Sequence, residues 1–219
     1  QSKNLNGKFF FFDTFTHRSM RLITTSAGSY PRIGDAPDLQ LLRRTISQWE
    51  KGEKSAHELA RAEDEMARQA IAEQTHAGLE LVTDGQVRWY DPLSHVAGKL
   101  EGIKINGLLR FFDTNFYFRQ PVVIGVVKHM RPIVLDEYRF ARSASSKPLK
   151  PVITGPYTLA RLSIVETDRY KSFESLVEAY ALAVAEEIGG LVEAGADIVQ
   201  IDEPAILKNK EHKDVFAAG

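Results

Sequence analysis

The feature that most constrains the fold is an alternation of short β-type runs with longer helical stretches along most of the chain. Such alternation is typical of a parallel sheet whose strands are joined by right-handed helical crossovers, either as a doubly wound open sheet or as a barrel. In both architectures the functional groups lie at the carboxyl ends of the strands. The expected strands are 22–25, 79–83, 122–127, 150–154 and 197–201.

The stretches between these runs have the composition and spacing of helices. A capping serine, Ser55, follows a break at Lys51-Gly52, so two helices in series are expected between residues 38 and 77. A shorter helix is expected over 135–143, and a long amphipathic helix over 172–194, where Gly195 stops it.

One segment interrupts the alternation. Residues 89–118 are rich in aromatic side chains, and glycines at 98, 102 and 107 divide them into short alternating runs, which indicates a β-hairpin insertion. About five strands have been used by residue 202, whereas a closed eight-stranded barrel typically needs about 250 residues. The predicted fold class is therefore α/β, a partial (β/α)8 TIM-like barrel with about its first five strands.

The beginning of the chain reads differently from the rest. Residues 1–19 contain five phenylalanines but neither the long apolar run nor the small-residue cleavage site of a secretory signal. We expect 1–19 to be an appended or poorly ordered leader. The folded unit is then 20–219, since a β-type run follows Met20 almost at once.

Composition excludes several classes of partner and site. The chain has 219 residues, and its 28 Lys and Arg balance 29 Asp and Glu to a formal net charge of −1, so no overall charge attracts nucleic acid or an anionic membrane. No apolar run approaches the ~18 residues of a membrane-spanning helix, and the simplest location is the cytoplasm. The absence of cysteine excludes a disulfide framework and a Cys-based zinc site within these residues.

Small or polar side chains stand where the expected strands end. They are Ser29, Asp84, Gln86, Thr154 and Asp202, each close to Gly or Pro. Because the carboxyl ends of parallel strands meet at one edge of a sheet, we expect these groups to share a rim.

Four of these strand-end segments together resemble the catalytic barrel of the cobalamin-independent methionine synthase family. They are 24–31 (TTSAGSYP), 81–86 (LVTDGQ), 154–158 (TGPYT) and 199–205 (VQIDEPA), and the likeness extends over 20–207. The resemblance implies a TIM-like barrel that transfers a methyl group to the sulfur of homocysteine, with a zinc ion that binds the thiolate.

The resemblance also assigns roles to individual residues. Asp202 would bind the substrate ammonium, and Ala27, Gly28 and Ser29 would receive the carboxylate through backbone N–H groups and a hydroxyl. Gln86 stands where long family members carry a Glu that also contacts the amino group. From the residues alone, Asp202 could instead cap the following helix, and 27–29 could be a plain tight turn.

Departures from the family pattern concern the methyl donor. At the position of Leu162 the family carries a Trp that stacks on folate, and near Phe116 it carries an Arg of the folate site. Lys208 replaces a Glu of the family. A folate site is therefore not expected. A shorter, single-barrel branch of the family, which the departures favour, implies methylcobalamin as a candidate donor and a corrinoid protein as a candidate partner.

The zinc site is the largest departure. The family uses a His, a Glu and two Cys late in the barrel, but this chain has no Cys, and its six His show no paired spacing, so no metal ligand is assigned here. We expect zinc in a complete family member and a chain truncated before the ligand region. The alternatives are a uroporphyrinogen-decarboxylase-like or corrinoid:thiol methyltransferase barrel, and a truncated homologue without catalysis.

Overall fold

The structure is a computed structural model that describes residues 22–30, 40–111 and 114–218. The expected leader, 1–19, lies outside the described residues. In chain order the elements are α1 (Leu41–Glu50), α2 (Ala56–His76), α3 (Pro92–Ala97), β1 (Glu101–Arg110), β2 (Tyr117–Lys128), α4 (Leu135–Ala144), β3 (Val152–Thr154), α5 (Pro156–Arg161), β4 (Ile164–Val165), α6 (Phe173–Glu193), β5 (Gln200–Asp202), the 3-10 helices η2 (Pro204–Lys208) and η3 (Lys210–His212), and α7 (Lys213–Ala218).

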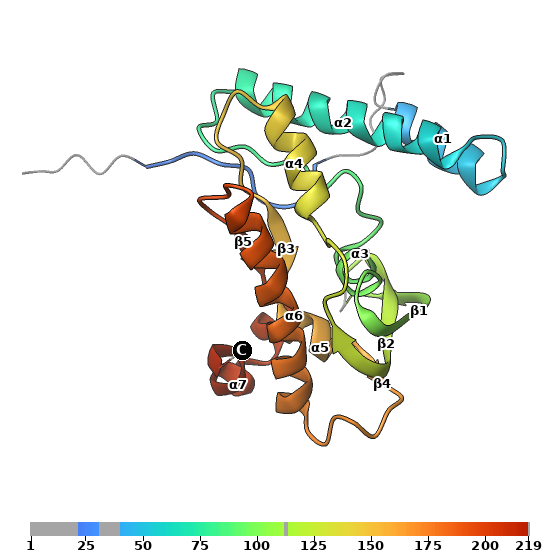
Figure 1. Cartoon of the computed structure of the whole chain (residues 1–219), viewed down its shortest axis with the longest axis vertical. Coiled ribbons are helices and arrows are strands. Elements are labelled where there is room, and N and C mark those ends of the chain that lie inside the picture. The colour runs from blue at the N-terminus through green and yellow to red at the C-terminus, as the bar shows by residue number, and fades with distance from the viewer. Residues whose placement is uncertain (1–21, 31–39, 112–113, 219) are drawn as a thin grey trace, which may run out of the picture.

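Four β segments lie side by side, parallel and in chain order. Single bridges join Thr25 to Leu81 and Val82 to Leu149, and β3 then pairs with β5 from Val152 opposite Gln200 to Thr154 opposite Asp202. Helices α1 and α2 connect the first two segments, and α6 precedes β5 (Figure 1). The α/β class is confirmed. Within the described residues these segments do not close into a barrel, so the partial TIM barrel is not confirmed.

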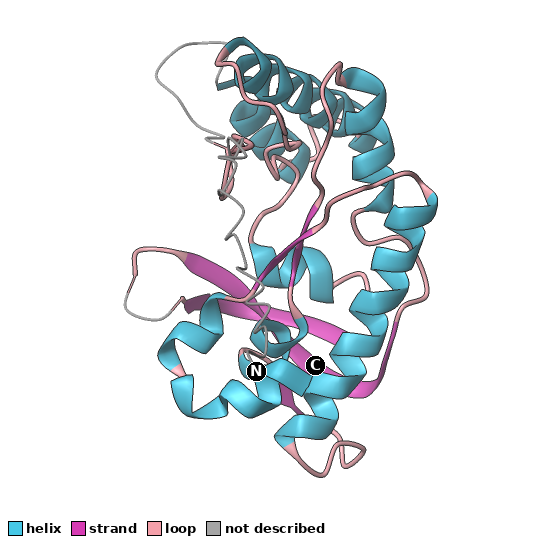
Figure 2. Cartoon of the chain, turned by 90° about the vertical axis from the view of Figure 1, so that its left-hand side faces the viewer, coloured by secondary structure: helices cyan, strands magenta, loops and turns pink. Residues whose placement is uncertain are grey.

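The insertion is a long hairpin, and it corrects one expected strand. Strands β1 and β2 pair antiparallel, with Ile103 opposite Val123 and Arg110 opposite Tyr117, and β4 adds to β2 in parallel. The run 122–127 belongs to this hairpin and not to the parallel series, so the described residues contain four segments of that series where five were expected. Figure 2 shows the hairpin as the long magenta pair, and in Figure 1 β1 and β2 lie to one side of β3 and β5.

Local signals set the helix boundaries. The Ser55 side chain accepts from Glu58 N, and the Glu58 carboxylate accepts from Ser55 N at 2.9 Å, a capping box that begins α2 as predicted. Ser172 caps α6 in the same way, and Gly195, at φ 91°, follows its end. None of the helices in the described ranges is long and apolar enough to cross a membrane.

The main core lies between the parallel segments, the hairpin and helices α3 to α6. Its fully buried members include Val82, Leu93, Val123 and Ile153. One carboxylate, Glu187 of α6, is completely buried there; its oxygens accept from the backbone N–H of Ile133, Val134 and Leu135, at the start of α4, and from His129. This contact fixes α4 against α6 and so supports the sheet that carries the site.

Candidate functional site

The turn after the first β segment and the turn after the second are in direct contact. Ser29 Oγ donates to Gln86 Oε1 at 2.9 Å, and Tyr30 N donates to Gly85 O at 2.8 Å. Gly28 has φ +78°, a conformation that favours glycine. Two of the predicted site residues, which are 57 positions apart in the sequence, are therefore brought together.

Gln86 is held in an unusual backbone conformation. In the described part of the chain, Gln86 is the one residue other than glycine with a positive φ, at +53°. Only 4% of its surface is exposed. Asp84 Oδ1 accepts from Gln86 N at 3.0 Å and supports this turn. Such conformations cost about 1–3 kcal/mol and are concentrated at functional sites. Gly85 is required beside it, because a Cβ there would lie 2.7 Å from Tyr30 Cβ.

Asp202 ends β5 at the same edge of the parallel series. Its backbone O accepts from Gly155 N at 2.9 Å, and its side-chain Oδ1 accepts from Gln200 Nε2 at 2.7 Å. The carboxylate is partly exposed, and Oδ2 has no hydrogen-bond partner among the described residues. It does not cap the next helix, since η2 begins at Pro204 without a side-chain cap. The carboxylate is therefore left with one oxygen available to a ligand.

Glu203, the next residue, is the cap of a different helix. Its Oε1 accepts from Tyr157 N at 2.8 Å and its Oε2 from Thr158 N at 2.7 Å, at the start of α5. Burial raises the pKa of the Glu203 carboxyl, although the hydrogen bonds from Thr158 and Tyr157 favour its charged form. The sequence motifs did not predict this contact; a signal for it was a Glu one residue before a Pro together with the Gly155-Pro156 turn.

Lys150, on the strand between the two halves of the site, was also missed. Only 5% of its surface is exposed, and its Nζ donates to Ser26 O at 3.1 Å and to Gln200 Oε1 at 2.5 Å. Burial lowers the pKa of this ammonium, and nearby Asp202 opposes the shift. Its only sequence signal was a lysine in a β-type run of Leu, Pro, Val and Ile.

A second ionic cluster lies behind the rim and joins α3 to α4. Glu137 Oε1 accepts from His95 Nε2 at 2.7 Å and from Lys99 Nζ at 2.8 Å, and its Oε2 accepts from Trp89 Nε1 at 3.1 Å. Burial alone would raise the pKa of Glu137, but His95 and Lys99 outweigh it and hold the pKa at about 2. Burial together with the negative charge of Glu137 raises the pKa of Asp84.

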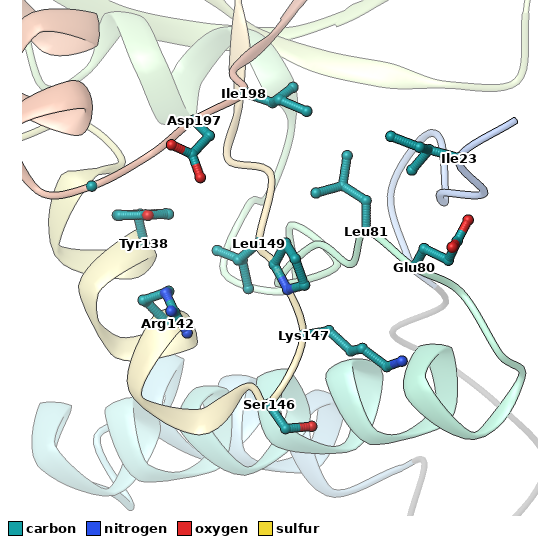
Figure 3. Close-up of a pocket in the computed structure, with 12 residues that line it drawn as sticks. Ile23, Glu80, Leu81, Tyr138, Arg142, Ser146, Lys147, Leu149, Asp197 and Ile198 are labelled. Carbon is teal, nitrogen blue, oxygen red and sulfur yellow. The ribbon is translucent and has the colours of Figure 1, made fainter. Parts of the chain in front are cut away.

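An open cavity lies away from this rim. A hollow of about 700 Å³ lies at the amino ends of the parallel segments (Figure 3). In that view Ile23, Leu81 and Ile198 stand around it, with Tyr138 and Arg142 on the α4 side. Ser29, Gln86 and Asp202 are not among its lining residues, because they lie at the opposite ends of the same segments.

Comparison with known proteins decides the family. The family model described as "Cobalamin-independent synthase, Catalytic domain" matches residues 22–215. The chain belongs to the cobalamin-independent methionine synthase family. The methionine synthases of Sulfurisphaera tokodaii and Sulfolobus acidocaldarius are 38% and 35% identical to it, over 86% and 87% of this chain and 54% of each relative. The chain therefore spans about half the length of these relatives.

Solved structures agree with the family. A B12-independent methionine synthase from Shewanella, solved with selenomethionine, has a TM-score of 0.68 and 25% identity, over 87% of this chain and 54% of that chain. A structure from Listeria monocytogenes has a TM-score of 0.66 at 18% identity, over 84% and 54% of the two chains, and shows the fold alone.

The family assignment corrects the expectation about cofactor and partner. A cobalamin-independent family gives no place to methylcobalamin as donor, so that prediction is wrong, and a corrinoid partner is not supported. The error has a physical cause. The expectation rested on departures from the family pattern at Leu162, Phe116 and Lys208, and a departure that would remove contacts to one ligand does not create a site for another.

The zinc ion that the family resemblance implies does not fit the residues described here. Residues 22–30, 40–111 and 114–218 contain no group of three or more His, Asp or Glu side chains placed to hold a metal ion, and the whole sequence has no Cys. His95 contacts Glu137, and His129 contacts Glu187 and Glu186, but these contacts are hydrogen bonds or ion pairs within the structure and none of them forms such a group. No step of a reaction is therefore assigned to zinc on these residues.

Proposed function

We propose that this chain binds homocysteine at the rim formed by Ser29, Gln86 and Asp202, and so takes part in methyl transfer to the homocysteine thiol to make methionine. The observation that carries the proposal is the pairing of two unlike groups at one edge of the parallel segments. Among the described residues, one is a turn whose backbone N–H groups at 27–29 donate no hydrogen bond, and the other is the Asp202 carboxylate, whose Oδ2 accepts none.

The turn suits the carboxylate end of an amino acid. Within the described part of the chain, no hydrogen bond occupies the backbone N–H of Ala27, Gly28 or Ser29. Successive N–H groups in a turn that contains a residue with positive φ form a concave site for an anion. The Ser29 hydroxyl, fixed by Gln86, adds a polar group beside them.

The opposite end of the rim suits an ammonium. Asp202 Oδ2 can accept a charge-assisted hydrogen bond, which is stronger than a neutral one. Gln86 Oε1 has a second lone pair after accepting from Ser29, and can accept from the same ammonium. The Shewanella relative was solved with selenomethionine, an amino acid of the same shape as the product. This supports an amino-acid site in the family.

We also propose that residues 20–219 are the amino-terminal part of a catalytic domain. The match to about half of each relative and of each solved chain supports a chain that spans part of such a domain. On this proposal the chain supplies groups that bind and orient the amino acid, and the thiolate-binding metal belongs to the other half.

The test is calorimetric titration of the protein with L-homocysteine and L-methionine, before and after Asp202→Asn. Asparagine keeps an oxygen that can accept from Gln200 Nε2 but loses the charge. Since Asp202 is partly exposed, we expect a loss of about 2 kcal/mol, or roughly 30-fold in affinity, at the low end for charged contacts. The matched control is Asp197→Asn, an exposed carboxylate at the opposite rim, which should bind as the wild type does. Equal affinities for Asp202→Asn and the wild type would refute the ammonium contact.

A further inference from the structure

Lys150 physically connects the two ends of the proposed amino-acid site. From the middle strand its ammonium reaches Ser26 O, next to the turn at 27–29, at 3.1 Å. It also reaches Gln200 Oε1 at 2.5 Å, and Gln200 Nε2 reaches Asp202 Oδ1 at 2.7 Å. Lys150 thus contacts the peptide next to the turn that would bind the substrate carboxylate. Through the Gln200 amide it is also connected to Asp202, which would bind the substrate ammonium.

The contact with Ser26 orients a donor. A peptide unit is planar and trans, so the C=O of Ser26 and the N–H of Ala27 point in opposite directions. When Lys150 binds Ser26 O, the N–H of Ala27 is turned away from Lys150. This direction keeps the Ala27 N–H out of competition with the ammonium and available to an anion in the turn.

The contact with Gln200 orients an acceptor. The amide of Gln200 can present either its oxygen or its nitrogen to Asp202, and only the nitrogen is compatible with a carboxylate. The Lys150 ammonium has donors alone, so it selects the amide oxygen and leaves Nε2 for Asp202 Oδ1. Asp202 is then held by one oxygen, with the other free.

The burial of the Lys150 ammonium lowers the free energy of unfolding unless its hydrogen bonds offset the loss of hydration. With 5% of its surface exposed, it forms no ion pair within 4.0 Å to any carboxylate in the described residues. A buried ammonium held by a carbonyl and an amide alone is less stable than one paired with a carboxylate, because its charge is not neutralised.

We propose that Lys150 is a positioning residue that sets the carboxylate-binding turn and Asp202 together for the amino-acid substrate. The inference rests on the proposed function, since it concerns the same rim. It assigns Lys150 no contact with the reacting sulfur. Its effect is on the affinity for the amino acid, and the part that it exerts through Gln200 depends on Asp202.

The test is a double-mutant cycle on L-methionine binding, measured by calorimetry with the wild type, Lys150→Met, Asp202→Asn and the double variant. Methionine preserves the length and apolar stem of Lys150 and removes the ammonium. We expect Lys150→Met to weaken binding about 10-fold in the wild-type background and less than 3-fold when Asp202 is already Asn. The control is Lys147→Met, three residues away, whose side chain makes no hydrogen bond in the described residues; its affinity should be unchanged.

A purely structural role gives a different result. In that case Lys150→Met would lower the urea midpoint and weaken binding by the same factor in both backgrounds, which would overturn the inference. Unchanged affinity in Lys150→Met would overturn it as well, while leaving the amino-acid site in place. No methionine binding by the folded wild type would refute the proposed function itself. If Lys150→Met does not fold, Gln200→Met breaks the same connection to Asp202, and its effect should likewise shrink in the Asp202→Asn background.

Discussion

Replacing Gly155 by alanine should displace the Glu203 carboxylate from the first turn of α5 and disturb the rim beside Asp202. A Cβ at position 155 would lie 2.3 Å from both Cδ and Oε1 of Glu203. Non-bonded carbons need about 3.5 Å, so the carboxylate must move by about 1 Å. That movement breaks its hydrogen bonds to Tyr157 N and Thr158 N, at 2.8 and 2.7 Å.

The size of the effect follows from these two bonds. A hydrogen bond to a charged group contributes about 1.5–3 kcal/mol, and Glu203 is only partly buried, so water replaces some of the loss. We expect the free energy of unfolding to fall by about 3 kcal/mol, a large share of the ~5–15 kcal/mol of an ordinary domain. The backbone adds nothing to this cost, because Gly155 has φ −78°, which alanine adopts freely.

Urea unfolding followed by tryptophan fluorescence measures the change. The control is Gly189→Ala, within α6, where a new Cβ meets nothing within 4 Å and should stabilise the protein by about 0.5–1 kcal/mol. In a Glu203→Ala background the Gly155→Ala change should cost almost nothing further, since the clashing carboxylate is gone. A loss of 3 kcal/mol in that background too, or less than about 0.5 kcal/mol in the wild type, would refute the reasoning.

Two further predictions concern acid stability and metal content. The pKa of Glu137 is held at about 2 in the folded state, whereas its ordinary value is 4.5. The contribution of this carboxylate to the free energy of unfolding should therefore be fully present above about pH 4.5 and should be lost as the pH falls toward 2. Glu137→Gln should remove roughly 3 kcal/mol of this dependence in acid and urea titrations, and parallel profiles for the two proteins would contradict it. Metal analysis of the purified 219-residue chain should find no stoichiometric zinc, because the sequence has no Cys and no metal-binding group is present in the described residues. Equimolar zinc in this chain would contradict the prediction.

Local sequence signals predicted local structure well. The break at Lys51-Gly52 and the cap at Ser55 are contained in a few residues each, and both helices begin and end near the predicted positions. The run at 122–127 is a strand as predicted, but its partner is not. Strand propensity records a fit to a half-buried pleated surface and does not record which strand lies beside it. Pairing with β1 was therefore not readable from the run itself.

Only the site residues that belong to recognisable sequence motifs could be predicted. The turn at Ser29 and the turn at Gln86 could be placed on one rim from the rule for parallel strands, and their hydrogen bond is consistent with it. Lys150 and Glu203 could not, because each acts through partners about 45 to 125 positions away. A lysine within an apolar run shows that a buried charge exists but not what it touches.

The most direct test is a crystal structure of the protein with L-selenomethionine, located by the anomalous signal of selenium. The predicted result places the ligand ammonium about 3 Å from Asp202 Oδ2, with its carboxylate on the N–H groups of Ala27 to Ser29. Selenium in the cavity beside Tyr138 and Arg142, at the opposite ends of the strands, with an empty rim, would contradict the proposed site.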